Sequence, residues 1–178
     1  MAHPAVRRLS VAAATSVAAL TAVIPATALA APHPTPAGTS GGGACLSVSS
    51  SEVQRALRVI GPPLGRRDLH WILRSKSTAR TPNCPPVMWA AFDTSRGTVS
   101  SPTAVLLFRP GKFLGPTTRK TAGYVQVTGS TPFSVTVTYR WPKPQDANAN
   151  PTGGPVSSTF VALGDSVFRF GELPPGIY

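Results

Sequence analysis

Residues 133–141 read FSVTVTYRW, and this stretch decides the fold class. Over 9 residues, large apolar side chains alternate with mostly polar ones, which is the period of a β-strand with one buried face. The predicted buried face consists of Phe133, Val135, Val137, Tyr139 and Trp141. Proline cannot continue the hydrogen bonding of a sheet, so Pro142 and Pro144 end the strand. We therefore predict a sheet with one solvent-facing surface.

Other segments along the chain also have strand character, and short turns separate most of them. They are residues 69–73, 87–92, 105–108, 112–114, 124–128, 156–163 and 166–170. Pro110-Gly111 and Gly164-Asp165 are turn sequences that join neighbouring strands as hairpins. Neighbouring strands on short turns favour an antiparallel arrangement.

One amphipathic helix is predicted before the strands. Its apolar positions follow helical spacing and are Val53, Ala56, Leu57 and Ile60. Ser49 and Glu52 have the spacing of a capping box, and the Gly-Pro-Pro sequence at 61–63 ends the helix. The expected fold class is α+β: an antiparallel β-meander of five to seven strands with one N-terminal helix packed on it.

The N-terminal residues have the layout of a secretory signal peptide. Arg7 and Arg8 precede an apolar run, and Ala28-Leu29-Ala30 is a small-x-small cleavage site. The alternative is a retained membrane anchor, but the run is Ala-rich, and a spanning helix needs about 20 strongly apolar residues. We interpret residues 1–30 as a signal peptide, 31–44 as a flexible Pro/Gly/Thr/Ser linker, and 45–178 as a single domain.

The chain has 2 cysteines, Cys45 and Cys84. In an oxidising compartment such a pair predicts a disulfide bond. A metal pair is the weaker alternative, because only His33 and His70 could add ligands after the signal peptide. Lipidation of Cys45 is not expected, because residues 42–44 are Gly-Gly-Ala rather than aliphatic. We expect no metal and no cofactor.

Positive charge dominates the predicted mature chain. Of the 17 Lys and Arg residues only Arg7 and Arg8 precede residue 31, whereas all 6 Asp and Glu follow it. This excess favours an anionic partner such as a cell-wall polymer or a membrane surface. The candidate anion-binding patch consists of Arg66, Arg67, Arg74, Lys76 and Arg80.

Other partners and explanations stay open. The charge could serve solubility alone, because the basic residues are scattered along the chain. Another exported protein is a possible partner, nucleic acid is not expected, and the sequence does not determine the oligomeric state. The loop Lys143–Pro155 is longer than most hairpin loops. Such loops often bind ligands, but we favour a structural crossover with a sharp turn at Gly153-Gly154 as the explanation.

Catalytic motifs are scarce. The sequence contains no H-E-x-x-H, G-x-S-x-G or Walker A motif. Asp68 and His70 would share a face of a strand, so a secreted hydrolase with an unconventional site is one alternative. An exported interaction or inhibitor module is another. We expect no catalytic residues and a non-enzymatic protein.

Four blocks follow one another through the strand region. They are Asn83-Cys84-Pro85 with Trp89-Ala90; Ser101-Pro102 with Val105–Phe108 and Phe113–Gly115; Val135–Trp141; and Asp146–Ala149 with Pro151–Gly154 and Leu173-Pro174. Together they resemble the actinobacterial LppP/LprE lipoprotein family over about residues 45–176.

The resemblance implies an exported, envelope-associated protein without an assigned enzymatic activity. The lipidated cysteine of that family is missing after the apolar run. We therefore expect a secreted, extracellular protein that is not lipid-anchored, and its association with the cell wall stays open.

Overall fold

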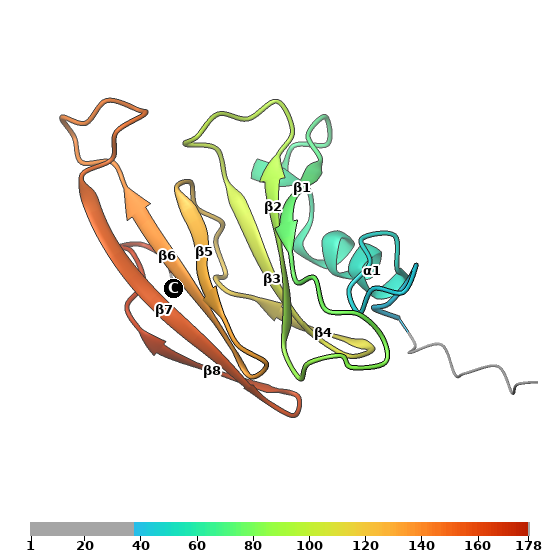
Figure 1. Cartoon of the computed structure of the whole chain (residues 1–178). Helices are drawn as coiled ribbons and strands as arrows, with labels where there is room; N and C mark the ends of the chain where they lie inside the picture. Colours follow the sequence, from blue (N-terminus) through green and yellow to red (C-terminus); the bar gives the residue numbers. More distant parts are fainter. Residues whose placement is uncertain (1–37, 178) are drawn as a thin grey trace, which may run out of the picture. The chain divides into compact units, whose positions relative to one another are not determined.

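The computed structural model describes residues 38–177 (Figure 1). The expected signal peptide 1–30 and residues 31–37 of the expected linker lie outside this range. Within it the chain forms one α-helix, one short 3-10 helix and eight strands. These are α1 (Ser51–Ile60), η1 (Pro63–Gly65), β1 (Trp71–Lys76), β2 (Met88–Thr94), β3 (Thr103–Arg109), β4 (Lys112–Pro116), β5 (Val125–Ser130), β6 (Ser134–Trp141), β7 (Gly153–Leu163) and β8 (Ser166–Gly171).

The described strands form two antiparallel sheets of four, with orders β1-β2-β3-β4 and β5-β6-β7-β8. The predicted antiparallel α+β class is confirmed, and every segment with strand character in the sequence is a strand. The chain has two four-stranded meanders, however, where we expected one of five to seven strands. Alternation shows which face of a strand is buried but not which strands pair. After β4 the chain crosses over and starts a second sheet.

Strand β3 is buried on both faces and separates two hydrophobic cores. Residues 103–108 are all buried. Ala104, Leu106 and Phe108 belong to the first core, together with α1 and the Cys45 segment. Val105 and Leu107 belong to the second core, which lies between the two sheets. The domain therefore has three layers: α1 with its adjoining loops, the β1–β4 sheet, and the β5–β8 sheet (Figure 1).

Strand β6 shows the alternation that its sequence predicts. Val135, Val137 and Tyr139 are at most 1% exposed, and the threonines between them point away from the core. Phe133 contradicts the prediction, because it precedes the strand and is 57% exposed. Trp141 is only partly buried, since the register shifts after Tyr139.

Helix α1 lies where the sequence predicts it, but its capping differs. Ser50, not Ser49, is the N-cap residue, and its side chain makes no capping hydrogen bond. The Glu52 carboxylate accepts hydrogen bonds from Arg55 and from the backbone N of Phe113 at 2.7 Å. Glu52 thus ties the helix to β4, and the capping-box prediction is wrong.

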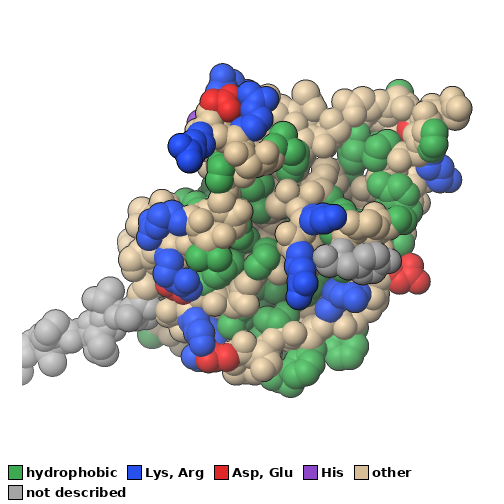
Figure 2. All heavy atoms as spheres, turned by 180° about the vertical axis from the view of Figure 1, so that it is seen from behind, with side chains coloured by type: hydrophobic (Ala, Val, Ile, Leu, Met, Phe, Trp, Pro, Cys, Tyr) green, Lys and Arg blue, Asp and Glu red, His purple; other side chains and the backbone are tan. Residues whose placement is uncertain are grey.

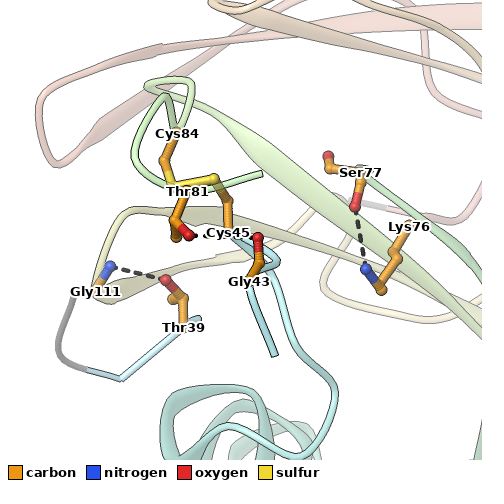
Figure 3. The surroundings of a disulfide bond; sticks show 8 residues. All are labelled: Thr39, Gly43, Cys45, Lys76, Ser77, Thr81, Cys84 and Gly111. Carbon is orange, nitrogen blue, oxygen red and sulfur yellow. Dashed lines mark hydrogen bonds between the residues drawn. A yellow bond between two sulfur atoms is a disulfide. The ribbon is translucent and has the colours of Figure 1, made fainter. Parts of the chain in front are cut away.

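The folded domain begins earlier than expected. Thr39 is 1% exposed, and its Oγ1 accepts a hydrogen bond from Gly111 N at 3.0 Å (Figure 3). Its carbonyl oxygen accepts a second bond, from Ser47 N at 2.8 Å. Residues 38–44, which we expected to belong to a flexible linker, are therefore part of the domain.

The predicted Cys45–Cys84 disulfide is confirmed (Figure 3). Backbone hydrogen bonds reinforce it on both sides, from Cys45 N to Ala79 O at 2.9 Å and from Thr81 N to Gly43 O at 3.1 Å. The bond holds the segment before β2 against the start of the domain. Among residues 38–177, no helix has the length and apolar character needed to cross a membrane.

Removal of the disulfide should destabilise the domain. Cys45 and Cys84 are 39 residues apart, and closing a loop of this length contributes about 3–4 kcal/mol in the chain-entropy model. We expect reductant to lower the urea midpoint of the protein by a corresponding amount. The Cys45→Ser/Cys84→Ser variant should show the lowered midpoint with or without reductant. An unchanged midpoint after reduction would contradict the structural importance of this bond.

Stability should also depend on Glu52 at acidic pH. The Arg55 hydrogen bond lowers the pKa of Glu52 from 4.5 to about 2, with a further contribution from Phe113 N. The folded state therefore gains stability above about pH 4.5 and loses it as the pH falls toward about 2. In urea unfolding at a series of pH values, Glu52→Gln should flatten the curve in this window. An identical slope in the variant would show that Glu52 does not contribute.

Candidate functional site

The two sheets diverge toward the β2–β3 and β6–β7 loops (Figure 1). A cavity of about 650 Å³ lies between them at this end. We call it the end cleft. Side chains from both sheets and both loops line it, including Arg74, Asp93, Thr98, Tyr124, Arg140 and Pro151. Four segments distant in sequence therefore meet at one site of mixed polar and apolar character.

Arg74 connects the two sheets at the end cleft. Its Nη1 lies 3.2 Å from Asp93 Oδ1, and its Nη2 donates a hydrogen bond of 2.7 Å to the carbonyl oxygen of Val125 on β5. Thr103 Oγ1 donates to the same aspartate oxygen at 2.8 Å. Asp93 is thus held between a cation and a hydroxyl group, and Arg74 has both of its terminal nitrogens engaged.

Arg140 is the available cation of the end cleft. Its backbone N donates to Tyr124 O at 3.2 Å, but its guanidinium makes no ion pair with any carboxylate of residues 38–177. Tyr124 contacts the long loop, because its hydroxyl group bonds to the carbonyl oxygen and to Oδ1 of Asn148. Arg140 and Tyr124 therefore line the same cavity, and a backbone hydrogen bond joins them.

Asp146 organises the long loop that lines the cleft. Its Oδ2 accepts hydrogen bonds from Lys143 N at 2.6 Å and from Thr152 N at 2.7 Å. These bonds, led by the one from Thr152, lower the pKa of Asp146. Asp146 therefore joins the two ends of the loop. The loop is shorter than expected, because β7 already begins at Gly153.

Residues 79–165 match the family model of the LppP/LprE lipoproteins. This match agrees with the family resemblance seen in the sequence. The confirmed resemblance covers β2 to β7, and with them most of the end cleft. Searches of curated proteins and of solved structures gave no match.

The structure does not gather the five predicted patch residues at one place. Arg66 makes two hydrogen bonds to Asp68, at 2.7 and 3.1 Å. Arg74 lines the end cleft and is paired with Asp93. Two of the five charges are therefore partly neutralised by neighbouring carboxylates.

The other three patch residues make no ion pair with the described carboxylates. Lys76 lies near the disulfide, and its Nζ donates to Ser77 O at 3.3 Å (Figure 3). Arg80 pairs through its backbone with Ala44, and Arg67 is exposed after η1. They remain candidates for anion binding, but at separate positions.

Asp68 and His70 do not form an acid–base pair. Hydrogen bonding to Arg66 lowers the pKa of Asp68, and no hydrogen bond joins its carboxylate to His70. The backbone N of His70 instead donates to Ser95 Oγ at 2.9 Å. Within residues 38–177, no three His, Cys, Asp or Glu side chains come together as they would around a metal ion.

Sequence reasoning missed Arg140 and Tyr124 as site residues. One signal for Arg140 was available, because it is the charged exception on the Ser/Thr face of the 133–141 strand. No local pattern distinguishes Tyr124, whose importance comes from contact with a loop 24 residues later.

Loss of Asp146 should loosen the loop without unfolding the domain. In Asp146→Ala the amides of Lys143 and Thr152 lose their carboxylate acceptor. We expect faster hydrogen exchange across residues 143–152 and unchanged exchange in β6. Unchanged loop exchange would contradict the role given to Asp146.

Proposed function

We propose that this LppP/LprE protein is a non-enzymatic envelope protein that binds an anionic component of the cell wall or the membrane. The family and the disulfide point to an exported, envelope-associated protein. Its charge distribution and the end cleft support the more specific proposal of an anionic ligand.

The observation that carries the proposal is the excess of cations without acidic partners. Within residues 38–177, six Lys and Arg side chains form ion pairs with carboxylates. The other cations of this range form none, and they are Arg58, Arg67, Lys76, Arg80, Arg119, Lys120, Arg140, Lys143 and Arg169. On the face shown in Figure 2, Lys and Arg side chains occupy several separate groups. Such a surface attracts polyanions.

The end cleft is the best candidate for specific binding among these positions. Arg140 lines a cavity of about 650 Å³ that also presents Tyr124, Gln126 and loop hydroxyl groups. A guanidinium binds phosphate and carboxylate oxygens well because its donors match their geometry. Of the described side chains that line the cleft, Asp93 is the acidic one, and Arg74 and Thr103 already engage it. This arrangement supports binding rather than acid–base catalysis.

The proposal can be tested with purified cell envelope and the chain from residue 31 onward. We expect saturable binding that weakens as salt rises, because salt screens charge interactions. Arg140→Glu should weaken binding by about tenfold or more, since a hydrogen bond to a charged group contributes about 1.5–3 kcal/mol.

Arg58→Glu is the matched control, because it reverses another unpaired exposed cation that does not line the end cleft. An equal loss in both variants would indicate diffuse attraction without a site. Absence of binding at every salt concentration would refute the proposed function.

A further inference from the structure

A second cavity, of about 540 Å³, lies beside the disulfide segment. Lys76, Asn83, Trp89, Ser130 and Thr131 are among the residues that line it. We call it the disulfide-side cavity. Figure 3 shows Lys76 and Ser77 in the surroundings of Cys84, at the end of β1.

The two cavities lie along the same edge of the domain. β1 and β5 are edge strands of their sheets. Gln126, near the start of β5, lines the end cleft, whereas Ser130, at the end of this strand, lines the disulfide-side cavity. On β1, Arg74 lines the first cavity and Lys76 the second. We call the edge formed by β1 and β5 the seam. Along β5 the residues that line the two cavities are four positions apart, or roughly 13 Å at about 3.3 Å per residue.

The chemistry of the seam alternates between aromatic surface, hydrogen-bonding groups and cations. Trp89 is partly buried and packs against the second core while also lining its cavity. Asn83 supplies an amide in the same cavity, whereas the Thr131 hydroxyl group there already accepts hydrogen bonds from the backbone N of Phe133 and of Ser134. Tyr124, Gln126 and Arg140 repeat this combination at the other end. Such groups suit a ligand with apolar ring faces, many hydroxyl groups and negative charges.

We infer that the seam binds a linear saccharide bearing phosphate or carboxylate groups, with one sugar ring packed on Trp89 and charges bound by Lys76 and Arg140. This inference rests on the proposed function and names its ligand class. Two separate cavities favour a chain over a small molecule, because linked contacts raise affinity through effective concentration.

An extended peptide that adds a strand to an edge is the main rival occupant. The Arg74 guanidinium already occupies the carbonyl oxygen of Val125 at 2.7 Å. A peptide pairing with β5 from its first residue would have to compete with this bond. A saccharide does not need the backbone ladder, so the observed contact favours it.

Ligand length and charge provide the first test, with the chain from residue 31 onward and intrinsic tryptophan fluorescence. The probes are galacturonate oligomers of two and six units, maltohexaose, and phosphorylated maltohexaose. We expect the charged hexamers to bind at least about tenfold more tightly than the dimer and than neutral maltohexaose. The stronger of the two charged hexamers identifies the preferred anionic group. Equal affinity for the dimer and the hexamer, or for neutral and charged hexamers, would overturn the inference.

Tryptophan variants locate the ligand. Trp89→Phe keeps an aromatic ring but should abolish the fluorescence change on binding when it is made in a Trp141→Phe background, which removes the indole next to Arg140. Trp71→Phe is the matched control, because the Trp71 indole donates to Gly61 O beside α1 and lines neither cavity. A fluorescence change that survives in Trp89→Phe would place the ligand elsewhere.

Two exposed positions keep the test independent of folding. Asn83→Ala and Arg140→Gln should each weaken charged-hexamer binding, Arg140→Gln by about tenfold, with unchanged melting temperatures. Suppose that wild-type protein binds envelope and that both variants bind the hexamers and the envelope as tightly as wild type. The inference that the seam binds the saccharide is then wrong, and the proposed function stands. If envelope and hexamers both fail to bind wild-type protein, both proposals fail.

Discussion

The double burial of β3 is the constraint on which the rest of the structure depends. Residues 103–108 face α1 and the disulfide segment on one side and the second sheet on the other. A strand that contributes to two cores is expected to be apolar at every position. Residues 104–108 are all apolar, and Thr103 is the polar exception at the start of the strand. Because both faces of β3 are covered, ligands cannot reach its central residues from either face of the sheet.

The end cleft and the disulfide-side cavity both lie along the β1–β5 seam, away from the central residues of β3. At an edge, side chains from two sheets meet without having to be apolar. Arg74 uses this position to bridge Asp93 and the carbonyl oxygen of Val125, which satisfies polar groups that would otherwise be exposed at the sheet margin. The same edge has a cavity of mixed polar and apolar lining at each end, one beside the long loop and one beside the disulfide.

The basic residues of the protein are dispersed over the domain. In the sequence, the basic residues from Arg66 to Arg80 form one segment. In an extended strand, however, each residue adds about 3.3 Å and successive side chains point to opposite faces, so these charges lie apart. Arg66 pairs with Asp68, Arg74 enters the end cleft, and Lys76 lies by the disulfide. Proximity in sequence therefore did not predict proximity in space for these residues. Arg140, which is distant from Arg74 in sequence, lines the same cavity as Arg74.

The sequence by itself determined the elements: the alternation at 133–141, the amphipathic helix at 51–60 and the single cysteine pair each rest on local or pairwise chemistry. Only the tertiary structure decided that eight strands divide into two sheets, and that Arg74 meets Val125 across 51 residues. Side-chain periodicity reports burial of a face but carries no information about strand partners. The cleft, which exists only where two sheets diverge, was for this reason beyond the reach of the sequence.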